Sequence, residues 1–175
     1  KNLLQVDLTN FKSESEQMWY LVDLIWDHYK CDNKNLNWEN IGKFYSHPVW
    51  LLNGLFIEQH DVSMGHRHAI SDWIVNNNFE SVVDYGGGFG TLARLVAEKD
   101  KNIQMNIYEP HPSEFGLKRA EEFENINIIG KLESNYDCLM STDVLEHVPD
   151  PLNDFSDMIK SVKLNGYLVI ANAFY

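Results

Sequence analysis

The sequence predicts an α/β fold in which a doubly wound, mostly parallel sheet follows an N-terminal helical region. After residue 80, short β-branched runs alternate with helical patterns, an order typical of parallel strands joined by helices. A glycine-rich loop stands where the first of these runs meets the first helical pattern. Residues 1–80 show helical spacing and turns instead. We therefore expect a helical cap over residues 1–63 and an α/β core over residues 64–175.

The elements of the N-terminal region follow from apolar spacing. Apolar residues three and four apart predict a first helix that Ser13 or Ser15 caps and that ends near Cys31. A further helix is expected over residues 65–77, with three buried residues, Ile70, Trp73 and Ile74. Residues 35–60 carry many large rings, among them Trp38, Phe44, Tyr45, Trp50 and Phe56. These rings either shape a substrate pocket or simply attach the cap helices to the sheet.

The core elements are bounded by turn residues. The expected strands cover residues 81–85, 103–108, 126–129, 136–140 and 167–171. Helical patterns follow the glycine loop, span residues 113–123, and begin again at Asp150 and Pro151, an N-cap followed by a first-turn proline. Asn165-Gly166 is expected to turn the chain into the last strand. The apolar side of the last helix is expected to comprise Leu152, Phe155, Ile159 and Val162.

Length and composition restrict the functional class. The chain has 175 residues, of which 44% are apolar, enough for the core of one domain with a small appendage. It carries 14 Lys+Arg against 26 Asp+Glu, a formal charge of −12, which argues against a nucleic-acid partner. Two cysteines in no metal-type spacing favour free thiols in a reducing compartment. No apolar run approaches the ~18 residues of a membrane span, so we expect a cytoplasmic protein without a membrane partner.

The glycine loop, Gly86-x-Gly88-x-Gly90, is the strongest functional signal. Glycine lets the chain turn sharply and lets a ligand approach bare backbone, while amides at the next helix offer donors. Glu109 lies 19 residues past Gly90 at the end of the second strand, where a carboxylate can accept hydrogen bonds from both hydroxyls of a ribose. A dinucleotide fingerprint would place a third glycine where Thr91 stands.

With these motifs the chain resembles the class I S-adenosylmethionine-dependent methyltransferases. The matching stretches are residues 82–90, 107–110, 136–148 and 165–170. The resemblance implies a Rossmann-like sheet, S-adenosyl-L-methionine as cofactor, and transfer of a methyl group by in-line displacement to a small-molecule nucleophile, preferably a hydroxyl. It covers residues 81–175 and not the N-terminal region.

The resemblance also implies the cofactor-binding residues. Asp84 and the glycine loop would hold the methionine end and Glu109 the ribose, Leu132 would lie near adenine, and Ser141 and Thr142, placed after the fourth strand, would border the sulfonium. The full set of expected cofactor contacts is Asp84, Gly86, Gly88, Gly90, Glu109, Pro110, Leu132, Ser141 and Thr142.

His147 is the candidate general base, because an imidazole titrates near neutral pH and follows the fourth strand at the edge where ligands bind. A packing or capping role for His147 is the alternative. Asp143, Glu146 and His147 resemble the divalent-metal pattern of ubiquinone-biosynthesis and small-RNA 2′-O-methyltransferases, although those begin with Glu, and we assign no metal ligand. His66 and His68 precede the first strand and have either a site role or a surface role.

Two other functions remain open at this stage. A nicotinamide-dependent oxidoreductase, using NAD(P), would share the strand–loop–helix unit, and a non-catalytic module could bind S-adenosylmethionine without reaction. Members of the resembled family add two strands after the fifth, and strands 6 and 7 are missing from this sequence. We therefore expect either a longer parent chain or a partner, such as a homo-oligomer, over the exposed edge.

Overall fold

A computed structural model describes residues 7, 9–11 and 13–172. The chain divides into two compact units, Lys1–His60 and Asp61–Tyr175, and each is described by itself. None of the helices among the described residues is both long enough and apolar enough to cross a membrane.

In the first unit, the described residues form the helices α1 (Glu14–His28), α2 (Trp38–Tyr45) and α3 (Trp50–Gln59). Ser13 caps α1 by accepting the Glu16 N–H at 3.2 Å. The buried ring of Phe44 packs edge-on against Trp26 and Trp50, with ring centroids 5.0 and 5.2 Å away. Several of the rings noted in the sequence therefore form the core of this unit itself.

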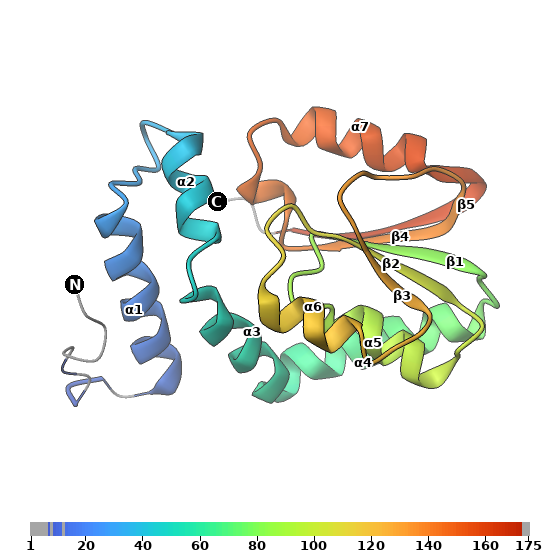
Figure 1. Cartoon of the computed structure of the whole chain (residues 1–175), viewed down its shortest axis with the longest axis horizontal. Helices are drawn as coiled ribbons and strands as arrows, with labels where there is room; N and C mark the ends of the chain where they lie inside the picture. Colours follow the sequence, from blue (N-terminus) through green and yellow to red (C-terminus); the bar gives the residue numbers. More distant parts are fainter. Residues whose placement is uncertain (1–6, 8, 12, 173–175) are drawn as a thin grey trace. The chain divides into compact units, whose positions relative to one another are not determined.

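The second unit is an α/β sheet protein (Figure 1). Its strands run β3-β2-β1-β4-β5 across the sheet, and every neighbouring pair is parallel. This order confirms the predicted doubly wound parallel sheet. The elements are α4 (Asp61–Asn76), β1 (Ser81–Tyr85), α5 (Thr91–Lys99), β2 (Gln104–Tyr108), α6 (Glu114–Ala120), β3 (Ile126–Ile129), β4 (Tyr136–Thr142), the 3₁₀ turn η2 (Leu145–His147), α7 (Pro151–Ser161) and β5 (Val162–Ala171).

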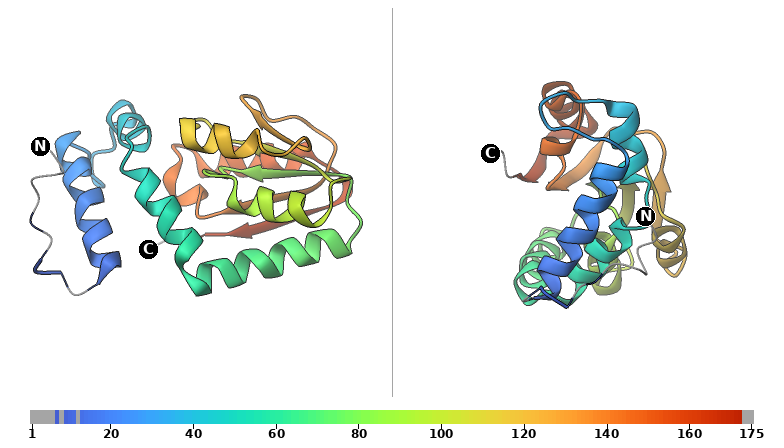
Figure 2. Two further views of the ribbon diagram at one scale, coloured as in Figure 1. Left: turned by 60° about the horizontal axis from the view of Figure 1, so that its bottom comes forward. Right: turned by 90° about the vertical axis from the view of Figure 1, so that its left-hand side faces the viewer.

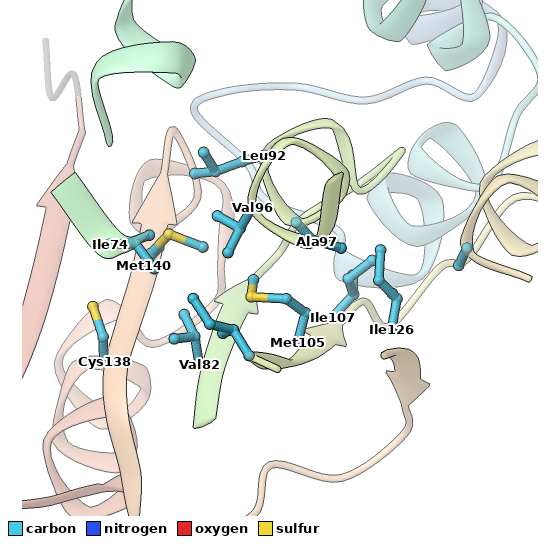
Figure 3. Packing of buried hydrophobic residues seen from close by; sticks show 13 residues of the cluster. Ile74, Val82, Leu92, Val96, Ala97, Met105, Ile107, Ile126, Cys138 and Met140 are labelled. Carbon is cyan, nitrogen blue, oxygen red and sulfur yellow. The ribbon is translucent and has the colours of Figure 1, made fainter. Parts of the chain in front are cut away.

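Helices cover both faces of this sheet. Residues of α4, α5 and α6 pack on one face, and α7 packs on the other, as the views of Figures 1 and 2 show. Figure 3 shows the first of these layers, in which Val96 of α5 and Ile74 of α4 lie over Val82 and Met140 of the sheet. Because side chains alternate along a strand, Val83 and Leu139 face the α7 layer instead.

The last strand begins earlier than expected. Val162 already pairs with Tyr136, and regular pairing resumes between Tyr167 and Cys138. The register of the pairing shifts between these two points, where Asn165 has a left-handed φ of 65°. Residues 162–171 all belong to β5, so the expected turn at Asn165-Gly166 is wrong, and this position is an irregularity inside the strand.

The predicted buried side of α7 is wrong. Leu152, Phe155 and Ile159 are exposed, and Met158 is fully buried. The side of α7 that faces the sheet instead carries Met158, in one buried cluster with Val83 and Leu139, and Asp154, which accepts a hydrogen bond from the Tyr85 hydroxyl on β1 at 2.9 Å. Asp150 does cap the helix, accepting the Asn153 N–H at 3.0 Å, as predicted.

The helix before the first strand also differs from expectation. It begins at Asp61 and ends at Asn76. Ile74 is fully buried, but Trp73 is exposed, and its ring lies against Phe79 and Tyr167 with centroids 5.5 and 5.4 Å away.

Candidate active site

The loop after β1 has the left-handed backbone that its glycines suggest. Gly86, Gly88 and Gly90 have φ values of 71°, 54° and 67°, a region that residues with a Cβ rarely adopt. The Gly90 N–H donates to the Gly87 carbonyl at 2.8 Å, which closes the loop tightly before α5 begins at Thr91. This loop presents backbone rather than side chains toward the carboxyl end of the sheet.

Neighbouring residues pack against most of the loop. A Cβ at Gly90 would lie 2.5 Å from Ile107 Cδ1, one at Gly87 would lie 2.7 Å from Asp84 Oδ2, and one at Gly86 would lie 2.6 Å from Val144 Cγ2. No described atom outside its chain neighbours lies within 4 Å of the corresponding point at Gly88, which is exposed. The loop therefore packs against side chains at three of its glycines and borders open space at Gly88.

Glu109 lies beside this opening. Its Oε2 accepts the Gly88 N–H at 2.9 Å, and its Oε1 accepts the His111 N–H, also at 2.9 Å. An ionised carboxylate offers about four lone-pair positions, so each oxygen can accept a further hydrogen bond. The structure thus brings the glycine loop and the acid after β2 together, with acceptors left for two hydroxyl groups.

Asp84 is buried beneath the loop at 4% exposure. Burial raises the pKa of this carboxyl to about 7, and the negative charge of Glu109 adds to the rise. The positive charge of Arg67 and a hydrogen bond from the Ala93 amide act in the opposite direction. The carboxyl therefore titrates near neutral pH and supports the loop from below, in contact with the position of Gly87.

Arg67 is a candidate site residue that the sequence interpretation missed. The two histidines beside it, His66 and His68, are exposed on α4, while Arg67 is half-buried and its charge reaches Asp84. A signal was available, because Arg67 stands three residues before Ile70 and seven before Ile74, on the side of the helix that packs on the core.

Ser141 and Thr142 belong to β4 itself, so their predicted place after the strand is wrong. They pair with Ile170 and Ala171 of β5, because β5 continues far enough to extend the ladder. The Ser141 hydroxyl is fully buried and has no hydrogen-bond partner among the described residues. An unsatisfied buried hydroxyl at the end of a central strand is a candidate ligand contact.

The segment after β4 is held by the end of β5. Asp143 has a left-handed φ of 55°, and its N–H donates to the Ala171 carbonyl at 2.7 Å. The next two amides, those of Val144 and Leu145, both donate to Asn172 Oδ1, at 3.1 and 3.0 Å. Asn172 was also missed, and its only sequence signal is its place just beyond a strand.

The remaining predicted residues lie around this centre. His147 is exposed at the end of η2 and its N–H donates to the Val144 carbonyl at 2.8 Å. Pro110 is exposed beside Glu109, and Leu132 is half-buried, packing against the α7-side core. Among the residues that the structure describes, no group of three or more His, Cys, Asp or Glu side chains is arranged to hold a metal ion.

These parts meet where the strand order reverses, between β1 and β4. In open α/β sheets, ligands bind in the crevice outside the carboxyl ends of the strands at this point. The site offers exposed backbone at Gly88, an acid with free acceptor positions, and a buried hydroxyl on β4. Such a set can hold a ribose-containing ligand.

Comparison with known proteins identifies related folds. A family model described as a methyltransferase domain matches residues 59–173. No curated protein sequence matches that of the chain.

Three solved structures show the same fold at low sequence identity. A protein described provisionally as a sarcosine dimethylglycine methyltransferase, from Galdieria sulphuraria, is 19% identical with a TM-score of 0.54, over 65% of this chain and 48% of that one. A protein from Methanococcus maripaludis, described provisionally as S-adenosyl-L-methionine-dependent methyltransferase, is 22% identical with a TM-score of 0.52, over 62% and 56%. A mitomycin 7-O-methyltransferase is 16% identical with a TM-score of 0.57, over 90% and 50%. The chain thus spans about half the length of these proteins.

Proposed function

The chain belongs to the family of methyltransferase domains, and from this premise we propose that it is an S-adenosylmethionine-dependent methyltransferase acting on a small molecule. The observation that carries the proposal is the hydrogen bond from Gly88 N–H to Glu109 Oε2, 2.9 Å long. It unites a bare-backbone loop with a carboxylate that can accept a ribose diol, which are the two features an adenosyl ligand needs.

The residues present fit this cofactor. Packing at Gly86, Gly87 and Gly90 excludes side chains from the loop, while Gly88 borders open space. We assign Glu109 to the ribose hydroxyls and Asp84, with the loop, to the methionine end. The positive charge of Arg67 acts on Asp84, and we assign Arg67 to the carboxylate at that end of the ligand.

The remaining contacts are assigned by their place at the strand ends. Ser141, whose buried hydroxyl lacks a partner among the described residues, and Thr142 are assigned to the sulfonium region. Leu132 and Pro110 are assigned to the adenine side, because they follow β3 and β2.

When bound, S-adenosylmethionine supplies a methyl group on a positively charged sulfur, which is already a good leaving group. The protein therefore has mainly to align the acceptor, and alignment can lower a barrier by roughly 7–11 kcal/mol. We assign His147 the role of general base, taking a proton from an acceptor hydroxyl, a contribution of about 10²–10⁴-fold. His147 is exposed at the end of η2, just after the carboxyl end of β4.

A hydroxyl acceptor is supported by the likeness to the mitomycin 7-O-methyltransferase, which aligns with 90% of this chain. The sarcosine dimethylglycine methyltransferase makes an amine the alternative acceptor. The net charge of −12 disfavours a nucleic-acid acceptor. Both cysteines, Cys31 and Cys138, are free and buried, which supports a cytoplasmic location.

Calorimetry with S-adenosylmethionine, S-adenosylhomocysteine and NAD tests the proposal. We expect the first two to bind, NAD not to bind, and Glu109→Ala to weaken binding while the control Glu121→Ala, at an exposed position after α6, leaves it unchanged. Binding of NAD alone would indicate an oxidoreductase.

Methyl transfer in an acceptor screen then distinguishes an enzyme from a binding module. Tritium transfer from labelled S-adenosylmethionine to hydroxylated acceptors is the expected result, reduced in His147→Ala at unchanged cofactor affinity. Transfer only to amines would replace the hydroxyl assignment.

A further inference from the structure

Two successive backbone amides of the segment after β4 donate to one side chain. Asp143 is left-handed, and Val144, with φ −121° and ψ −49°, is not in a strand conformation, so the chain leaves the sheet abruptly. Successive amides in such a turn point toward a common centre and form a small anion-binding nest. Here the centre is occupied by Asn172 Oδ1, which accepts the Val144 and Leu145 amides at 3.1 and 3.0 Å.

The held segment in turn covers the glycine loop. The two methyl groups of Val144 occupy the space over Gly86, lying 2.6 and 3.0 Å from the point where a Cβ would be. Gly86 is fixed from its other side, because its N–H donates to the Tyr108 carbonyl at 2.7 Å. If Val144 moved away, Gly86 would therefore stay in place, and a gap would open beside the glycine loop.

The same segment carries the candidate base. η2 begins at Leu145, whose amide is one of the two that Asn172 accepts, and ends at His147. The His147 N–H closes this turn onto the Val144 carbonyl. The Asn172 carboxamide thus holds the backbone of Val144, which lies over Gly86, and the first residue of η2, which ends at His147.

We propose that Asn172 is a positioning residue of the methyltransferase site, and that its Oδ1 fixes residues 143–147 so that Val144 closes the glycine loop at Gly86. The inference rests on the proposed function, since it assigns the site at the loop to S-adenosylmethionine. Asn172 itself is not assigned a contact with the ligand.

The test compares Asn172→Leu, which removes the acceptor, with Asn172→Asp, which keeps an oxygen at the same place. Asn153→Leu, at an exposed position on α7, is the matched control. The first measurement is amide hydrogen exchange of the whole chain without ligand. In Asn172→Leu we expect the Val144 and Leu145 amides to exchange about tenfold faster, with wild-type rates in Asn172→Asp and Asn153→Leu.

The second measurement is the affinity for S-adenosylhomocysteine by calorimetry. We expect a weakening of about tenfold in Asn172→Leu and recovery to within about threefold of wild type in Asn172→Asp. A merely structural role would speed exchange of the two amides in Asn172→Leu without changing the affinity for S-adenosylhomocysteine. Val144→Ala provides a second route if Asn172→Leu does not fold, and it should weaken binding while leaving the Leu145 amide protected.

The outcomes separate the two proposals. Unchanged exchange in Asn172→Leu, or faster exchange with unchanged affinity, overturns the role of Asn172. Unchanged affinity in Val144→Ala overturns the step through Gly86. Failure of the wild-type chain to bind S-adenosylhomocysteine overturns the proposed function, and the exchange rates then still decide whether Asn172 holds the segment.

Discussion

The Gly88 N–H and Glu109 Oε2 are joined by a hydrogen bond of 2.9 Å, although 21 residues separate them along the chain. Because β1 and β2 are adjacent and parallel, their carboxyl ends meet at one edge of the sheet. The acid therefore both orders the glycine loop and remains available to a ligand.

Replacing Glu109 by Ala should weaken S-adenosylhomocysteine binding by roughly 10–100-fold, since hydrogen bonds to a charged group contribute about 1.5–3 kcal/mol. Calorimetry provides the measurement, with exposed Glu121→Ala as the control. Equal affinity in wild type and Glu109→Ala would remove the ribose assignment.

Gly90 and Gly88 should respond differently to alanine. Gly90→Ala combines a left-handed backbone with a contact 2.5 Å from Ile107 Cδ1, and should lower the free energy of unfolding by about 2–5 kcal/mol. Gly88→Ala meets open space and should cost only about 1–2 kcal/mol from its backbone. Urea unfolding checks the order, with Gly130→Ala, which also meets open space, as a control near zero. Equal losses at Gly88 and Gly90 would contradict the packing described.

Asp84 should make stability depend on pH between about 4 and 7. Burial raises its folded pKa to about 7, above an unfolded value of about 3.9, so the folded state holds the proton more tightly. The resulting stabilisation is complete below pH 4 and is lost as pH rises through 7, by up to about 1.4 kcal/mol per pH unit. Asp84→Asn should lack this component, and the difference in unfolding free energy between variant and wild type should grow with pH. A constant difference across this range would show that Asp84 stays ionised.

Arg67 should affect the site, and its neighbouring histidines should not. Loss of its positive charge in Arg67→Met raises the pKa of Asp84 further and should shift the pH dependence just described to higher pH. Removing a charge interaction of about 1 kcal/mol also weakens S-adenosylhomocysteine binding, by about three- to tenfold. His68→Gln, at an exposed position on the same helix, is the control. A larger effect from His68→Gln would return the site role to the histidine.

Asp137 should contribute far more to stability than a surface ion pair. It is 7% exposed, accepts the Glu80 and Ser81 amides at 2.7 and 2.9 Å, and pairs with Lys163. Burial alone would raise its pKa, but the hydrogen bonds from Lys163 and the two amides outweigh burial and lower it. The stabilisation is therefore present above the unfolded pKa and is lost as pH falls through the lowered folded value.

Asp137→Ala should cost about 2–4 kcal/mol in urea unfolding at pH 7, because it leaves buried donors without an acceptor. Asp157→Ala removes an exposed pair with Lys160 and should cost less than about 1 kcal/mol. Similar costs for the two variants would contradict the structural role of Asp137.

Local signals in the sequence predicted much of this fold correctly. The β-branched runs, the glycines of the loop and the Asp150-Pro151 helix start each depend on neighbouring residues, and the structure confirms them. Short-range sterics and hydrogen bonds determine such features before any tertiary contact forms.

Apart from Arg67, the features that sequence interpretation missed depend on distant partners. The side of α7 that faces the sheet is in contact with strands far away in the sequence, as shown by Tyr85 and Asp154, which are 69 residues apart in the chain. The place of Ser141 inside β4 follows from pairing with Ile170, and the place of residues 143–147 follows from Asn172. The sequence by itself was sufficient to predict the strands, the glycine loop and the position of Glu109. Which side chains meet around them depended on packing between segments far apart in sequence, because a buried polar group takes the partner that folding brings to it.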